Sequence, residues 1–311
     1  MSTPAYFTGS PVPVPPSEQG LPTRIAEPWF KVSDEVLQLE GLCFDRSGKL
    51  YFLEVFGGTV FSLEPGSKKL STLFKLDGLN PASVKIHRNG QLYISLLGDF
   101  SKGGLLICNP DGSGRRTILQ DYVVDDIVFA SDGGFYFTHF VGSSCEPTGG
   151  VFHVSADEVV TPVMRNMAGP NGVALSVDER VLWVTETNAN RLHRIDLAAD
   201  GKTIAPYGTC VPYHFTGYHG PDSCSIDSDD NLYVAMYYQG RVMAFNRLGF
   251  PIGQFLLPGR DDGKHLLTTH PMLVPGSRQL LICTNDPIGK QGSWIFSAEG
   301  FATAHQSYQF K

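Results

Sequence analysis

A unit of two short strands joined by a tight polar turn occurs six times along the 311 residues. In each copy an alternating apolar run ends at a polar turn, and a second apolar run carrying an aromatic residue or leucine follows. Two of the turns are Asn89-Gly90 and Asp132-Gly133, and such pairs between alternating hydrophobic runs strongly predict β-hairpins. The six copies span residues 40–52, 82–94, 125–137, 171–184, 222–234 and 270–282.

Successive copies begin 42, 43, 46, 51 and 48 residues apart. A period of this size, with strand pairs and no helical pattern, is typical of a β-propeller. We therefore predict an all-β fold with six blades and a metal site at the central axis. Residues 1–25 are rich in proline, and we expect an N-terminal arm that is extended on the surface or partly disordered. Residues 26–311 are expected to form the single propeller domain.

Composition and charge narrow the class of protein. The net charge of -7 argues against nucleic acid as a partner. No apolar run approaches the length of a membrane span, and the first residues lack the basic and apolar regions of a secretory signal, so we expect neither a membrane partner nor a secretory signal. The six cysteines are widely spaced without a Cys-x-x-Cys pair, which favours buried reduced thiols over disulfides or metal ligands.

The start of each inner strand of a propeller lies beside the central axis, so equivalent positions of the six copies converge. Three carboxylates that meet in this way repel one another, and burial increases the cost. Either some of them are protonated or a cation lies among them. The converging positions hold Glu40, Ala82, Asp125, Asn171, Asp222 and His270.

The donor types at this point indicate calcium. Oxygen-only sets of six to eight ligands suit Ca²⁺, whereas zinc would require cysteine or several histidines. His270 is expected either to orient substrate at the rim or to neighbour the ligands. The candidate metal ligands are Glu40, Asp125, Asn171, Asp222 and the hydroxyl of Ser223.

A Lewis acid at the bottom of an open mouth suggests ester hydrolysis, because it polarises a carbonyl and stabilises the oxyanion that forms. Asp222 lies in the best-defined motif and is the candidate for proton transfer. The sequence has no Gly-x-Ser-x-Gly, His-Glu-x-x-His or Ser-x-x-Lys motif, the usual signals of serine hydrolases and zincins. Two alternatives stay open: a phosphotriesterase of the same fold, and a non-catalytic ligand-binding propeller with structural calcium.

Several segments carry recognisable motifs, among them residues 37–42, 125–129, 171–176, 185–194 and 220–224. These motifs resemble those of the gluconolactonase, senescence-marker-protein and luciferin-regenerating-enzyme superfamily, and the likeness extends from about Glu35 to Phe310. The resemblance implies a six-bladed propeller, a calcium-dependent lactonase with a small-molecule lactone substrate, and a cytoplasmic location. It assigns the metal ligands to the same five residues and the proton-transferring aspartate to Asp222. Close relatives carry an acidic residue where this chain has His139, which bears on substrate preference at the mouth.

The resemblance also implies a second calcium site, because a relative in this family binds a further ion on a loop of the second and third blades. The corresponding positions here are Ser101, Gly103 and Asp121, but the Thr- and Tyr-containing insert that completes the site is missing before Asp125. Such a donor set falls short of the six to eight oxygens that Ca²⁺ takes. We therefore predict one tightly held ion at the axis and a second site that is empty or weak.

Overall fold

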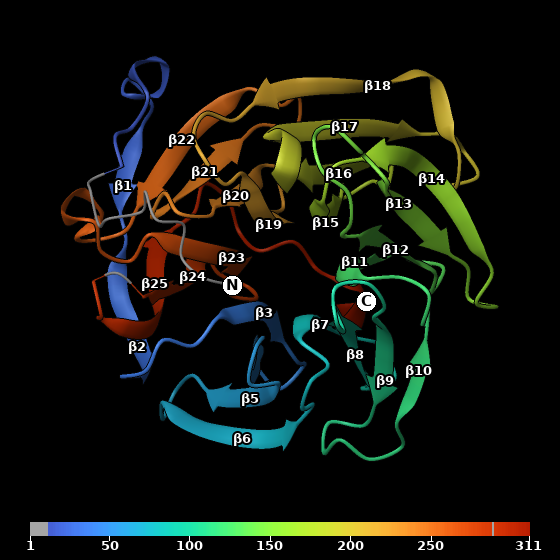
Figure 1. Cartoon of the computed structure of the whole chain (residues 1–311), viewed down its shortest axis with the longest axis horizontal. Helices are drawn as coiled ribbons and strands as arrows, with labels where there is room; N and C mark the ends of the chain where they lie inside the picture. Colours follow the sequence, from blue (N-terminus) through green and yellow to red (C-terminus); the bar gives the residue numbers. More distant parts are fainter. Residues whose placement is uncertain (1–11, 288) are drawn as a thin grey trace.

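The computed structural model describes residues 12–287 and 289–311. Their strands form six sheets that surround a central axis in chain order, so the predicted all-β six-bladed propeller is confirmed (Figure 1). The innermost strand of each blade runs beside the axis. These inner strands are β3 (Leu39–Phe44), β7 (Pro81–Ile86), β11 (Val124–Phe129), β15 (Pro170–Leu175), β19 (Pro221–Ile226) and β23 (Leu267–Leu273).

Three antiparallel strands follow outward from the inner strand in each of the six blades, and the outermost strand of the sixth blade comes from the N-terminal part of the chain. The predicted tight turns join the first two strands, as Asn89-Gly90 does between β7 and β8. Short 3-10 segments occur at Pro16–Glu18 (η1), Thr187–Ala189 (η2), Arg260–Asp262 (η3) and Tyr308–Phe310 (η4). The outer strands are β4 (Leu50–Glu54), β5 (Thr59–Glu64), β6 (Lys69–Lys75), β8 (Leu92–Leu96), β9 (Gly104–Cys108), β10 (Arg116–Ile118), β12 (Phe135–His139), β13 (Gly149–Val154), β14 (Val160–Met167), β16 (Val181–Glu186), β17 (Arg191–Leu197), β18 (Ile204–His214), β20 (Leu232–Met236), β21 (Arg241–Phe245), β22 (Pro251–Leu256), β24 (Gln279–Asp286) and β25 (Gly292–Glu299).

The chain closes the ring with its N-terminal part. Strand β2 (Glu27–Ser33) pairs antiparallel with β25, so the sixth blade combines both ends of the domain. Strand β1 (Thr23–Ile25) pairs parallel with β22 and adds a fifth strand to the fifth blade. The last three residues of the expected arm are thus part of a sheet. Residues 1–11 of that arm lie outside the described residues.

The hydrophobic core lies mainly between neighbouring blades, where the alternating side chains of facing sheets interdigitate. Leu53, Val84 and Ile94, for example, pack between the first and second blades without exposed surface. All six cysteines are free thiols; four are buried as expected, but Cys145 and Cys210 are exposed. Within the described part of the chain, no helix is long and apolar enough to cross a membrane.

Every inner strand carries a β-bulge near its start. In the hairpin formed by the first two strands of each blade, two residues of the inner strand lie opposite one residue of the second strand. This is the pairing of a β-bulge, which adds one residue to the inner strand. A bulge re-aims side chains, and here it does so at the same level in all six blades. The first bulge residues are Gly41, Ala82, Asp125, Asn171, Asp222 and Thr269.

This register refines the equivalence expected from the repeats. Glu40 is not the counterpart of Asp125 but the residue before the bulge, paired with Leu53. His270 is the second bulge residue of the sixth blade, after Thr269. The repeat spacing places each hairpin, but it cannot show where the extra residue of a bulge lies.

The C-terminal segment after β25 crosses the other end of the axis, where the inner strands finish (Figure 1). Ala304 forms a bridge with Asp227, and the Tyr308 ring stacks on Phe129 with 4.9 Å between centroids. A cavity of about 100 Å³ lies between this segment and the inner strands, and Lys85 is among its lining residues. Neither the three predicted carboxylate ligands nor Asn171 line it, so this end of the axis is separate from the predicted site.

Candidate functional site

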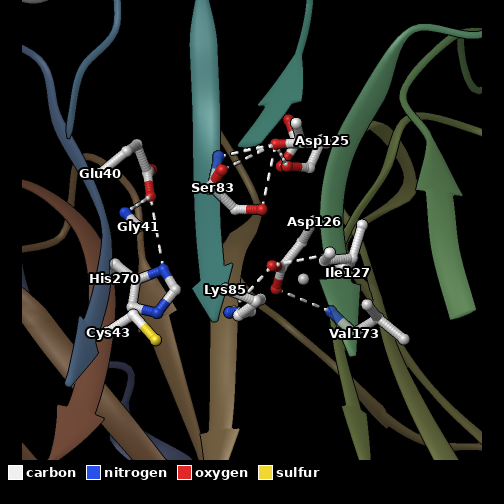
Figure 2. A network of polar contacts seen from close by, with 12 residues as sticks. Glu40, Gly41, Cys43, Ser83, Lys85, Asp125, Asp126, Ile127, Val173 and His270 are labelled. Atoms are coloured by element: carbon white, nitrogen blue, oxygen red, sulfur yellow. Dashed lines mark hydrogen bonds and ion pairs between the residues drawn. The ribbon is translucent and has the colours of Figure 1, made fainter. Parts of the chain in front are cut away.

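Three carboxylates lie at the mouth, which we define as the end of the axis where the inner strands begin. Glu40 comes from β3, Asp125 from β11 and Asp222 from β19, and each has only 6% or 7% of its surface exposed. Figure 2 shows Glu40 and Asp125 on either side of β7. The charges of both aspartates act on Glu40, so these three residues from three blades are within electrostatic reach of one another.

The mouth is short of positive charge. Burial raises the pKa of Glu40 well above its ordinary value, and the charges of Asp222 and Asp125 raise it further. Burial also raises the pKa of Asp125, again with Asp222 adding to the effect. The pKa of Asp222 rises to about 8 by burial, although hydrogen bonds from the Asn171 side chain and the Ser223 N–H oppose the rise. A cation among these groups would stabilise their ionised forms.

The donor chemistry at the mouth fits a hard cation. The side-chain oxygen of Asn171 is buried without a hydrogen-bond partner, and the buried Ser223 follows Asp222 in the same bulge. Among the described residues, no three Asp, Glu, His or Cys side chains converge closely enough to hold an ion by themselves. A site here therefore needs the amide and hydroxyl oxygens as well as carboxylates, which is the mixed oxygen set that Ca²⁺ accepts.

His270 lies beneath the mouth with no exposed surface, so it is not a solvent-facing rim residue. Its Nδ1 is 3.5 Å from Glu40 Oε2, but neither ring nitrogen makes a hydrogen bond. Burial, with help from the charge of Lys85, holds the pKa of His270 well below its usual range. The ring is therefore neutral and adds no positive charge beside Glu40.

Asp126 and Lys85 form a buried ion pair one layer below the mouth (Figure 2). Lys85 Nζ is 3.0 Å from Asp126 Oδ1, which also accepts a hydrogen bond from the N–H of Ile127 at 2.8 Å. Burial acts to lower the pKa of Lys85, but the charge and hydrogen bond of Asp126, together with Cys43 and Cys224, outweigh it and the pKa is raised. Lys85 is thus paired with Asp126 and not with the carboxylates of the mouth. The sequence repeats singled out Asp125 but not the ion pair of its neighbour Asp126.

Tyr237 is a further mouth residue that the repeats did not single out. Its hydroxyl donates to Gln38 Oε1 at 3.2 Å, and the amide of Asn285 donates to the same oxygen at 2.7 Å. Burial raises the pKa of Tyr237, and the charge of Asp222 adds to it, which places the phenol near that carboxylate. The Tyr237 ring also meets Tyr238 edge-on, and Tyr238 stacks on His219. An aromatic wall therefore borders Asp222.

The remaining predicted residues lie in the second and third blades. Ser101 donates both its N–H and its hydroxyl to Asp99, at 2.9 and 2.7 Å, while the N–H of Gly103 donates to the Tyr122 carbonyl. Asp121 is exposed. His139 is half-buried at the end of β12, and its Nδ1 accepts a hydrogen bond from the N–H of Val123 at 3.0 Å. Burial lowers the pKa of His139.

Comparisons with known proteins agree with this architecture. The chain is 57% identical to the protein named Lactonase drp35 of Staphylococcus saprophyticus, over 98% of this chain and 97% of that protein. It is 54% identical to Lactonase drp35 of Staphylococcus aureus, over 95% and 93% of the two chains. The calcium-binding protein regucalcin from Agrobacterium tumefaciens superposes with a TM-score of 0.73 at 19% identity, over 92% of this chain and 99% of that one. The last likeness shows the fold alone.

Residues 39–262 match the family model of the SMP-30/Gluconolactonase/LRE-like region. The matched segment runs from the inner strand that carries Glu40 to the end of the fifth blade, and so includes the bulges of Asp125, Asn171 and Asp222. This match and the identity to the staphylococcal proteins show that the chain belongs to the SMP-30/gluconolactonase/LRE-like family.

Proposed function

We propose that this protein is a calcium-dependent lactonase, which hydrolyses the ester bond of a small-molecule lactone. The observation that carries the proposal is the group of three buried carboxylates at the mouth, in a chain 57% identical to a protein named as a lactonase. Ester hydrolysis requires a group that stabilises the developing oxyanion and a group that moves protons. The mouth supplies candidates for both.

Glu40, Asp125, Asn171, Asp222 and Ser223 would hold one calcium ion, which when bound supplies a Lewis acid for the ester carbonyl. Asp222 accepts a proton from the attacking water and returns it to the leaving oxygen of the opened ring. Tyr237, tied through Gln38 to Asn285, gives the substrate one fixed wall beside Asp222. The buried neutral ring of His270 limits access of water to Glu40 from below.

The rate constants of two substrate classes test this proposal. We expect kcat/KM to be far higher for a panel of aromatic and aliphatic lactones than for an aryl phosphotriester. Asp222→Asn should lower kcat by about 10²- to 10⁴-fold, the usual contribution of a proton-transfer group, while the protein stays folded. Asp229→Asn, which changes an exposed aspartate in a turn of the same blade, is the matched control and should leave kcat unchanged.

Two other outcomes would reassign the function. A higher kcat/KM for the phosphotriester would make the protein a propeller phosphotriesterase. Calcium binding without turnover of either class would make it a ligand-binding propeller in which calcium is structural. The cytoplasmic location and the weak or empty second site at Ser101, Gly103 and Asp121 stay predictions from the sequence.

A further inference from the structure

Three buried hydroxyl groups occupy one structural position in consecutive blades. Ser95 of β8, Thr138 of β12 and Thr185 of β16 each lie on the second strand of a blade, opposite the bulge of the inner strand. None of the three side chains has exposed surface. A buried hydroxyl requires hydrogen-bond partners, so their contacts indicate what these residues do.

Each hydroxyl first accepts a hydrogen bond from the bulge of its own blade. The N–H of Ser83 donates to Ser95 at 2.7 Å, that of Asp126 to Thr138 at 3.1 Å and that of Gly172 to Thr185 at 2.8 Å. These N–H groups belong to the second bulge residues, which have no partner in the strand ladder. The hydroxyl replaces that lost partner and fixes the shape of the bulge.

Each hydroxyl then donates its single proton to the next blade. Ser95 donates to the carbonyl of Asp125, Thr138 to that of Asn171 at 2.5 Å and Thr185 to that of Asp222 at 2.7 Å. The carbonyls of their own blades are more distant, at 3.4 Å for Thr138 and 3.5 Å for Thr185. Each acceptor is the backbone of a candidate metal ligand.

The distribution of hydroxyls around the ring follows the ligands. In the three other blades the position opposite the bulge holds Phe52, Ala235 or Cys283. After Phe52 and Ala235, the next blade carries no candidate ligand at its bulge. The blade after that of Cys283 carries Glu40. At this boundary the hydroxyl comes from the inner strand of the sixth blade instead: Thr269 donates to the carbonyl of Leu39, the residue before Glu40, at 2.7 Å.

We propose that Ser95, Thr138 and Thr185 are positioning residues that set the placement of Asp125, Asn171 and Asp222 relative to one another across the blade boundaries. This inference rests on the proposed function, because it takes these residues to be calcium ligands. Affinity for a metal depends on groups that orient its ligands, and losing such a group typically costs 10- to 100-fold. The hydroxyls hold the ligand backbones in register, so the side chains reach the mouth at a common level.

Calcium affinity, measured by isothermal titration calorimetry on the folded full chain, tests the proposal without relying on turnover. Thr185→Val keeps the side-chain shape but removes the bridge, and should weaken calcium binding by about 10-fold. Thr185→Ser restores a hydroxyl and should bind calcium nearly as well as the parent. Thr284→Val is the control, because it removes an equally buried threonine hydroxyl that bonds to the carbonyls of His265 and Asn285 instead.

Thr138→Val provides a second test should Thr185→Val fold poorly, and it should lower affinity in the same way. A merely structural role predicts that Thr185→Val and Thr284→Val lower the melting temperature alike while calcium affinity stays at the parent value, and that result would overturn the inference. A parent that binds calcium but hydrolyses no lactone would refute the proposed activity, and the affinities of the variants would still decide the positioning role. A parent that binds no calcium would contradict both.

Discussion

Asp125 and Asp126 show how one bulge divides two neighbouring carboxylates between different environments. In a regular strand successive side chains point to opposite faces. Here the bulge lets Asp125 face the mouth with Glu40 and Asp222, while Asp126 pairs with Lys85 one layer below. The upper carboxylate is left without a positive partner, and the lower one is neutralised. A cation is therefore expected above the ion pair and not within it.

The raised pKa of Asp222 predicts how the metal-free protein responds to pH. With a pKa of about 8 in the folded protein against an ordinary 3.8, the protonated form is favoured by folding. The stability that this group contributes is fully present below pH 4 and is lost as pH rises toward 8. The slope approaches about 1.4 kcal/mol per pH unit within that window. Asp222→Asn removes this contribution, so in chelator its melting temperature should fall less between pH 5 and pH 8.

Thermal melts of both proteins across this range, with and without calcium, provide the measurement. Calcium should raise the melting temperature of the parent most at pH 8, where the carboxylates are ionised. Parallel pH profiles of the metal-free parent and of Asp222→Asn would contradict the raised pKa.

The sequence predicted the position of a candidate site residue correctly where the residue type and its place in the repeat were enough to identify it. Asp125, Asn171 and Asp222 begin equivalent units, and the structure finds all three at the first bulge position. Glu40 and His270 were assigned to the same position, but each lies one residue away from it. Lys85 and the hydroxyls of Thr138 and Thr185 were missed, because only the register across a bulge shows which side chains meet there.

Among the elements, strand β3 depends on a glycine at its bulge. Gly41 has φ of +67°, and a Cβ there would lie 2.8 Å from the backbone nitrogen of Val84. Gly48, in the following turn, has φ of +85° with open space around it. The two positions therefore share an unfavourable backbone conformation, but only Gly41 also faces the backbone of the next blade.

Gly41→Ala should destabilise the protein by about 2–4 kcal/mol, since left-handed strain and overpacking add. Gly48→Ala, the matched control, should cost only about 1 kcal/mol from the strain alone. Chemical denaturation of the two variants measures the difference. Equal losses of unfolding free energy in the two variants would mean that β3 and β7 move apart to accept the added methyl group without an energetic penalty.

The N-terminal arm is held by a buried ion pair that the sequence did not reveal. Glu18, in η1, places its Oε2 2.5 Å from Nη1 of Arg241 in β21, and neither side chain has more than 2% of its surface exposed. Tyr213 donates to the other carboxylate oxygen of Glu18 at 2.6 Å. The proline content of the arm predicted an extended segment, but a lone glutamate in such a segment gives no sign of a partner more than two hundred residues away.

Glu18→Gln should therefore destabilise the protein by about 3–5 kcal/mol, because it leaves the guanidinium of Arg241 buried without its counter-charge. The double variant Glu18→Gln/Arg241→Met removes both charges and should recover part of the loss. Denaturant titrations of the single and double variants measure the effect. A loss below about 1 kcal/mol for Glu18→Gln would indicate an exposed pair instead.

On the scale of the whole molecule, the candidate ligands come from four blades: Glu40 from the first, Asp125 from the third, Asn171 from the fourth and Asp222 from the fifth. An ion bound among them, as we propose, would link parts of the ring that are distant in sequence. Because such an ion binds only the folded state, calcium at 100 times its Kd should stabilise the protein by about 2.7 kcal/mol. Scanning calorimetry of metal-free protein over a calcium titration measures this, and an unchanged melting curve would contradict the link.

The most direct test of the central claim is a calcium titration of metal-free protein in which bound metal and lactone hydrolysis are measured on the same samples. Activity should be absent in chelator, rise in proportion to bound calcium and reach its maximum at about one ion per chain, as the single oxygen-donor set at the mouth predicts. Asp222→Asn should show little activity at any calcium content. Full lactone hydrolysis in chelator, with the loss of calcium verified by elemental analysis, would contradict a calcium-dependent lactonase.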